Sequence, residues 1–166
     1  DSDSDTDTDL TDCAVAAPLA GPGIVTISES GGIWTLYRDG TPYYIKGIGG
    51  QTNLSLAAAY GANSTRTWGS ENAQNVLNDA AALGMTVHLG IWLSHSAADF
   101  TNDSYKNGIR AEIQGLLNDY RNHNALLMWA LGNEINLGAD TQAAWEFVNE
   151  LADRKSVCRE RVLTDV

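Results

Sequence analysis

The sequence predicts an α/β fold built on a parallel sheet, and two observations support this. From residue 43 onward, short apolar runs alternate with longer amphipathic segments, which is the order expected when each strand is followed by a helix. The clearest run, residues 126–131, is wholly apolar and is bounded by polar residues, as for a strand buried on both faces of a sheet. Right-handed β–α crossovers then make the strands parallel.

Composition limits the classes of function. The chain has 166 residues, 43% of them hydrophobic, which is enough for the core of one domain. The formal net charge is −11, but six of the 21 acidic residues lie in the first twelve positions, so the other 15 acids and 10 bases leave the rest at −5. This mild acidity argues against a nucleic-acid binder, which needs a basic face. No apolar run reaches the ~18 residues of a membrane span.

The first 23 residues are predicted to be a disordered acidic linker. Residues 1–12 alternate Asp with Ser or Thr and cannot bury apolar surface. The tract is similar to calcium-binding Asp-x-Asp-x-Asp loops, but it lacks the Gly and the distal Glu of an EF-hand loop, so we predict no metal and no cofactor. Cys13 and Cys158 lack metal-ligand or redox spacing and leave the redox compartment undecided.

Residues 24–42 are predicted to form a β-hairpin that leads into the domain. Residues 24–28 alternate apolar and polar side chains, and residues 33–37 form a second run after a Ser-Gly-Gly turn at 30–32. Asp39 and Gly40 then supply a further turn signal.

The first two β–α units follow. Residues 43–48 form an apolar run that ends in two glycines, before a short helix over 54–60 that Gly61 closes. A short strand over 64–68 precedes a helix over 71–83, for which Ser70 is the candidate N-cap. The predicted inner face of that helix comprises Val76, Leu77, Ala80 and Leu83.

Two more units complete the pattern. A strand over 85–93 and a polar loop over 94–103 precede a helix over 105–122, and a strand over 126–132 precedes a helix over 141–153 with Asp140 as its candidate N-cap. Their predicted apolar stripes comprise Ile109, Ile113, Leu116, Leu117 and Tyr120, and then Ala144, Trp145, Val148 and Leu151. The four units over 43–153 fit an open doubly wound sheet or half of an eight-fold barrel. Residues 154–166 hold four of the ten basic residues and form an atypical tail.

Polar and aromatic side chains gather where the predicted strands end. In either architecture, the carboxyl ends of parallel strands form the functional face. The candidate binding residues at these ends are Arg66, Trp68, Trp92, His95, Asn133 and Asn136. Sugars bind through aromatic stacking and through hydrogen bonds to amide and charged groups, so the set suits a carbohydrate. No Gly-rich fingerprint opens a helix, which argues against a phosphate ligand.

Several of these residues have structural alternatives. Trp68 and Trp92 are alternatively core aromatics, and Arg66 is alternatively a structural arginine paired with Glu134. His88 lies in the middle of a predicted strand and is assigned to the interior.

Glu134 is the candidate catalytic residue. It follows the apolar run 126–131 after only Gly132 and Asn133, and the end of a buried strand is where an α/β barrel keeps its chemistry. Burial beside apolar side chains favours the protonated form of a carboxyl group. We therefore predict that Glu134 is a general acid/base and that Asn133 positions a substrate hydroxyl. The alternative is a helix-capping or solvated loop glutamate.

Four segments resemble the TIM-barrel domain of glycoside hydrolase family 2 and, more broadly, the retaining glycosidases of clan A. They read YYIKGIGG at 43–50, GANSTRTWG at 61–69, GMTVHLGIWL at 84–93 and LLMWALGNEIN at 126–136. The resemblance implies a (β/α)8 barrel truncated to about four β–α units. It also implies that Glu134 is the acid/base, that Asn133 contacts the sugar 2-hydroxyl and that Arg66 supports the site.

The resemblance implies a glycosidase that hydrolyses O-glycosidic bonds of oligosaccharides or polysaccharides with retention. Such enzymes need a second carboxylate, the nucleophile, about 5–5.5 Å from the first. In this clan it comes from the seventh barrel strand, and a full barrel takes ~250 residues. We therefore expect a truncation or frameshift near Asp153, and a 166-residue chain that is inactive alone.

Other functions stay open. One is a non-catalytic carbohydrate-binding half-barrel or pseudo-enzyme, and another is a transglycosidase, because the sequence is also similar to fungal glucanosyltransferases. Two half-barrels could also pair through their exposed sheet edges, which would make the chain self-associate. Acidic Ser/Thr tracts often tether exported domains, which favours a secreted, periplasmic or surface-tethered location.

Overall fold

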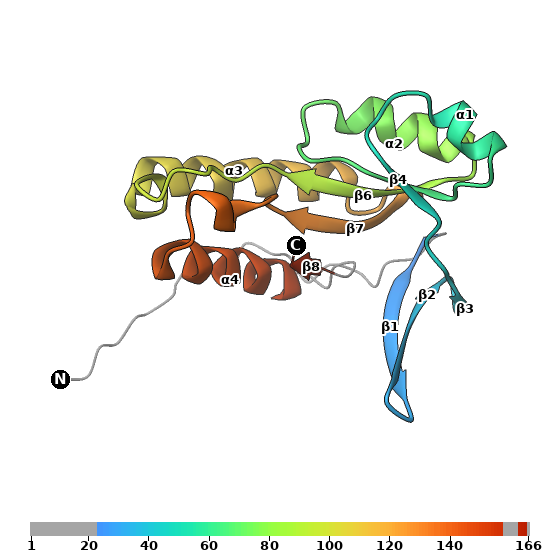
Figure 1. Cartoon of the computed structure of the whole chain (residues 1–166), viewed down its shortest axis with the longest axis horizontal. Helices are drawn as coiled ribbons and strands as arrows, with labels where there is room; N and C mark the ends of the chain where they lie inside the picture. Colours follow the sequence, from blue (N-terminus) through green and yellow to red (C-terminus); the bar gives the residue numbers. More distant parts are fainter. Residues whose placement is uncertain (1–22, 158–162, 166) are drawn as a thin grey trace.

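The computed structural model describes residues 23–157 and 163–165. It contains a three-stranded antiparallel sheet and a five-stranded parallel sheet with helices packed against it (Figure 1). The predicted α/β class and the small β lead-in are therefore confirmed. The acidic tract over 1–22, Cys13 and Cys158 lie outside the described residues. Across the described residues, no helix combines the length and the apolarity needed to cross a bilayer.

The antiparallel sheet is built from two tight turns. Strands β1 (Val25–Ser30) and β2 (Ile33–Arg38) pair with Ser30 opposite Ile33, so two glycines alone make the turn. Asp39 and Gly40 make the turn into β3 (Thr41–Pro42). All four turn residues have positive φ, between 52° and 82°, which is the requirement of a two-residue turn that matches the twist of the strands.

The parallel sheet has the strand order of a barrel. Its strands are β4 (Gly47–Gly49), β5 (Ser64–Arg66), β6 (Thr86–Ile91), β7 (Leu126–Leu131) and β8 (Leu163–Asp165), in the order β4-β5-β6-β7-β8. Each crossover moves one place in the same direction, so right-handed connections put the helices on one face. A doubly wound sheet would reverse direction at a switch point. The order thus favours the barrel over the open sheet.

The helices occupy the predicted intervals with shifted ends. They are α1 (Leu54–Ala59), α2 (Ala73–Ala82), α3 (Asp103–Tyr120) and α4 (Gln142–Val157), with 3-10 turns η1 (Asp99–Thr101) and η2 (Ile135–Leu137). Part of the predicted tail therefore continues α4, and β8 follows as a fifth strand beyond the four predicted units.

Two predicted N-caps are wrong. Helix α2 begins after Asn72, and the Ser70 hydroxyl instead donates to Glu112 Oε1 at 2.7 Å. At α4, Thr141 Oγ1 accepts from the main-chain N–H of Ala144 at 3.3 Å, whereas Asp140 accepts from a Trp indole at 2.7 Å. Each predicted cap residue is thus hydrogen-bonded to another side chain, Ser70 to Glu112 and Asp140 to Trp145, and caps no helix.

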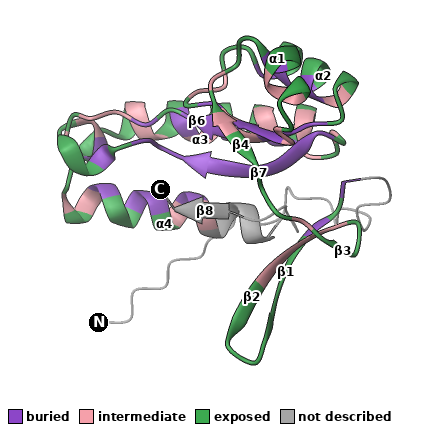
Figure 2. Ribbon diagram, turned by 45° about the vertical axis from the view of Figure 1, so that its right-hand side comes forward, coloured by how far each residue is buried: buried purple, intermediate pink, exposed green. Residues whose placement is uncertain are grey.

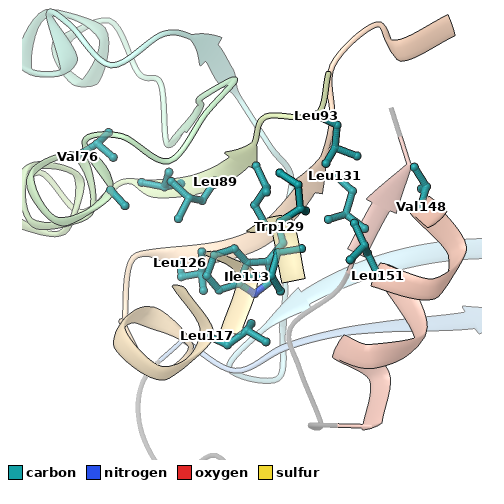
Figure 3. Packing of buried hydrophobic residues seen from close by; sticks show 14 of the residues in the cluster. Val76, Leu89, Leu93, Ile113, Leu117, Leu126, Trp129, Leu131, Val148 and Leu151 are labelled. Carbon is teal, nitrogen blue, oxygen red and sulfur yellow. The ribbon is translucent and has the colours of Figure 1, made fainter. Parts of the chain in front are cut away.

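The apolar stripes of α2, α3 and α4 pack onto one face of the sheet (Figure 3). Strand β7 is buried along its whole length (Figure 2), as its continuous apolar run predicted. The burial predicted for two stripe residues is wrong, because Leu83 and Trp145 are 38% and 37% exposed. Leu83 is the C-cap residue of α2, and the Trp145 indole N–H is held at the surface by Asp140. Trp129 is fully buried and centres the core.

The hairpin joins the domain at the amino ends of the parallel strands (Figure 1). Val25 packs on Leu127 and Met128 of β7, the Tyr43 hydroxyl donates to Asn63 O at 2.8 Å, and Arg38 Nη2 donates to the Asn124 carbonyl at 2.7 Å. The opposite, carboxyl ends of the strands carry the candidate site.

Candidate functional site

The predicted site residues follow three neighbouring strands. Arg66 ends β5 and Trp68 lies two residues beyond it, while Trp92 and His95 follow β6, and Asn133, Glu134 and Asn136 follow β7. Because the three strands are parallel and adjacent, these segments meet at one edge of the sheet. The structure links two of them, Arg66 and His95, to Asn133 by hydrogen bonds.

Asn133 is the centre of the hydrogen bonding. It is 9% exposed, and its Oδ1 accepts from Arg66 Nη2 at 3.0 Å. Since a guanidinium only donates, this bond fixes the orientation of the amide and leaves the Nδ2 protons to donate elsewhere. The Asn133 carbonyl also accepts from His95 Nε2 at 2.7 Å. The alternative that Arg66 pairs with Glu134 is therefore wrong, because Arg66 reaches the neighbouring amide.

Glu134 lies in a sharp turn after β7. Gly132 has φ 76°, and Glu134 itself has φ 52° and ψ 32°, in the left-handed region. This conformation costs a residue with a side chain about 1–3 kcal/mol and is characteristic of functional sites. The Glu134 side chain is exposed, so the predicted burial beside apolar neighbours is wrong. The turn carries the carboxyl group out of the buried strand.

Two exposed tryptophans follow the strands β5 and β6 at the same edge of the sheet. Trp68 and Trp92 are 44% and 43% exposed, so the core alternative is wrong for both. The Trp92 ring lies 5.1 Å from the His95 ring, centroid to centroid, at a tilt of 40°. The Trp68 ring packs over Gly49, where an added Cβ would lie 3.2 Å from Trp68 Cη2. Both indoles present apolar faces on which a sugar could stack.

A pocket of about 470 Å³ lies beside Trp68, lined by Ile45, Gly47, Ile48, Gly49, Ser64, Thr65, Arg66, Trp68 and His88. Burial, and then the neighbouring Arg66 charge, lower the pKa of His88 to about 4, although a main-chain hydrogen bond at Trp129 opposes the shift. The imidazole is therefore neutral near pH 7. His88 is half-buried, in keeping with its predicted interior position, but it also lines the pocket.

Sequence reasoning missed the residues that join the strand ends. Gly90 lies against the main chain of Thr67 and Trp68, and its N–H donates to Thr67 Oγ1 at 2.9 Å. Gly138 lies against His95, whose Cβ would be 3.3 Å from a Cβ added at the glycine. Glycines inside or after strands signal such close approaches, but the sequence does not say which segment approaches.

Asn136 is exposed on η2, and none of the links described above joins it to the other candidates. In the part of the chain that the structure describes, no group of three His, Cys, Asp or Glu side chains is placed to hold a metal ion.

Comparisons with known proteins identify the family and the fold of the chain. The family model for the TIM barrel domain of glycosyl hydrolases family 2 matches residues 53–165. No curated protein matches the sequence. Among solved structures, a GH2 β-galacturonidase from Eisenbergiella tayi bound to galacturonate is 23% identical with a TM-score of 0.69, covering 87% of this chain and 28% of that one.

Two β-glucuronidases are similar in the same way. That of Parabacteroides merdae is 18% identical with a TM-score of 0.68, covering 86% of this chain and 20% of that chain. That of Bifidobacterium dentium, complexed with coumarin-3-O-glucuronide, is 22% identical with a TM-score of 0.69. The match covers 87% of this chain and 26% of that chain. These likenesses show the fold, and the chain spans less than a third of the length of each protein.

Proposed function

The chain belongs to the family of glycosyl hydrolases family 2 TIM barrel domains, and on that premise we propose that it supplies the acid/base half of a retaining glycosidase site. The observation that carries the proposal is the pairing of Asn133 and Glu134 at the carboxyl end of β7, with the Asn133 amide fixed by Arg66 at 3.0 Å. That pairing is what the family resemblance requires of an acid/base and its sugar-binding neighbour.

The proposed chemistry uses Glu134 twice. Its carboxyl group protonates the glycosidic oxygen as the leaving group departs, and the carboxylate then takes a proton from the water that hydrolyses the glycosyl intermediate. The free Nδ2 protons of Asn133 donate to the sugar 2-hydroxyl, because Arg66 occupies the amide oxygen. The exposed rings of Trp68 and Trp92 offer stacking surfaces at the same edge of the sheet.

The nucleophile of this mechanism is a second carboxylate about 5–5.5 Å from Glu134. By the family resemblance it comes from the seventh barrel strand, and the described parallel sheet has five strands. The proposed hydrolysis is therefore an activity of a barrel in which further strands complete the site.

Glycosides of uronic acids are the first substrates to test. The similar structures include a β-galacturonidase bound to galacturonate and a β-glucuronidase complexed with a coumarin glucuronide. We propose aryl β-glucuronides and β-galacturonides as the first probes, with the corresponding neutral glycosides as comparison.

The test is Glu134→Gln in the protein that carries this chain within a complete barrel. General acid/base catalysis contributes about 10²–10⁴-fold, so hydrolysis of glycosides with poor leaving groups should fall by that factor. Glu146→Gln is the matched control, because Glu146 is an exposed glutamate on α4. Equal activity of the two variants would remove Glu134 from the mechanism.

A second candidate is carbohydrate binding without hydrolysis, favoured by the exposure of Trp68 and Trp92. Titration of oligosaccharides into the chain, followed by tryptophan fluorescence, should then show saturable binding that Trp92→Ala weakens and Glu134→Gln leaves unchanged. Measurable turnover by the protein would decide against this candidate.

A further inference from the structure

The backbone of Glu134 is held on both sides. The Asn133–Glu134 peptide is fixed through its carbonyl oxygen, which accepts from His95 Nε2 at 2.7 Å. The next peptide, between Glu134 and Ile135, is fixed through the Glu134 carbonyl, which accepts from the N–H of Leu137 at 2.9 Å. When both flanking peptide planes are fixed, φ and ψ of Glu134 are fixed as well, and so is the direction of its Cα–Cβ bond.

The two restraints differ in origin. The bond from Leu137 is local and belongs to η2, whereas His95 reaches over from the loop after β6. His95 is itself held, because its ring contacts Trp92 at 5.1 Å and its main chain packs against Gly138. A carbonyl oxygen only accepts, so His95 must carry a proton on Nε2.

We propose that His95 is a positioning residue for the acid/base Glu134, and this rests on the proposed function. Its imidazole holds the Asn133–Glu134 peptide so that Glu134 keeps its left-handed conformation and directs its carboxyl group to the glycosidic oxygen. In this role Nε2 of His95 is engaged by the main chain, and direct binding of the sugar by His95 stays a prediction.

Two variants separate the hydrogen bond from the ring. His95→Phe keeps a ring against Trp92 but removes the donor, whereas His95→Gln keeps an N–H donor and removes the ring. His123→Phe is the matched control, since His123 precedes β7 at the opposite end of the strand and its Nε2 contacts Asn78 at 3.2 Å.

The first readout is independent of catalysis. In the isotope-labelled chain, the three-bond coupling between the amide and α protons of Glu134 reports its φ angle. We expect the left-handed value in the wild type, in His95→Gln and in His123→Phe, and its loss in His95→Phe. The wild-type imidazole spectrum should show the proton of His95 on Nε2. A neutral His95 with its proton on Nδ1 only, or an unchanged Glu134 coupling in His95→Phe, overturns the proposal. The tautomer measurement needs no variant to fold.

The second readout is kinetic, in the complete barrel. For poor leaving groups, His95→Phe should lower kcat about 10- to 100-fold, since small misplacements of a catalytic group have effects of this size, and His95→Gln should recover most of it. KM should change less than about 2-fold. A rise in KM with a loss that is equal for all leaving groups would make His95 a sugar ligand and overturn the proposal. If the wild type hydrolyses no glycoside, the proposed function fails, and the Glu134 coupling still decides whether His95 positions that residue.

Discussion

Replacing Gly90 by Ala tests the contact that joins β5 to β6 beneath the site. An added Cβ would lie 2.5 Å from the main-chain carbon of Trp68 and 2.6 Å from its oxygen, and it would also meet the Thr67 carbonyl. Ordinary contact begins at 3.4 Å, so the strands must separate by about 1 Å to clear the nearest of these atoms, the Thr67 carbonyl oxygen. Because the opposing atoms belong to the main chain, no side-chain rotation can relieve the overlap.

Overpacking of a core typically costs about 1–3 kcal/mol, and a clash with main-chain atoms belongs at the upper end of that range. For a chain of this size, each kcal/mol lowers Tm by about 2–4 °C. Gly108→Ala is the control, because Gly108 lies in α3 with no atom within 4 Å of the added Cβ. Ala in a helix interior should stabilise by about 0.5–1 kcal/mol.

The Tm values of the two variants, measured by circular dichroism, should therefore shift in opposite directions: down for Gly90→Ala and up for Gly108→Ala. The reasoning fails if Gly90→Ala unfolds at or above the wild-type temperature while Gly108→Ala behaves as expected. The same separation should displace Arg66, one residue before Thr67, and so break its 3.0 Å bond to Asn133. An activity loss larger than the stability loss would report that displacement.

Particular contacts also predict the effects of Asn102→Ala on stability, of pH on stability through His88, and of Arg66→Met on sugar binding. Asn102→Ala should destabilise the fold by about 1 kcal/mol in urea unfolding, because Asn102 Oδ1 caps α3 by accepting two main-chain N–H groups. The folded-state pKa of His88 is lowered from 6.5 to about 4. Between pH 6.5 and 4, the unfolded chain therefore binds a proton at His88 that the folded chain does not. Stability should therefore fall as pH drops from 6.5 to 4, by up to about 3 kcal/mol, and His88→Gln should lack this component of the pH dependence. Arg66→Met should free the Asn133 amide to rotate and should raise KM for sugars that carry a 2-hydroxyl more than for 2-deoxy analogues.

The sequence predicted best where a local pattern was sufficient. Strand β7, including Trp129, is buried over every residue, as its continuous apolar run predicted. The hairpin turns follow from residues that accept positive φ. In these segments the burial and the backbone angles depend on neighbours in the chain, which the sequence displays.

Long-range contacts account for the features of the fold and of the site that the sequence did not predict. The predicted strand over 43–48 shortens to β4 because the Asn63 side chain binds the main chain before it: Oδ1 accepts from Lys46 N at 2.7 Å, and Nδ2 donates to Tyr44 O at 2.9 Å. In the site, the residue types at the strand ends were predictable, but the bond from His95 to the Asn133 carbonyl depends on how two loops pack. The exposure of Glu134 depends on a left-handed turn that its own residue type does not favour.

The exposure of Glu134 and the restraint of its backbone bear on the same question. Glu134 and Glu146 are both exposed glutamates, so exposure does not distinguish the two residues. What distinguishes Glu134 is position: a hydrogen bond on each flanking peptide, an oriented amide beside it and exposed indoles after the strands β5 and β6. Orientation of this kind lowers the barrier by itself, and shielding the reacting groups from water strengthens the electrostatic interactions between them. We therefore expect the catalytic effect of Glu134 to be largest in a complete barrel, where substrate and further strands enclose a carboxyl group whose direction β7 and His95 set.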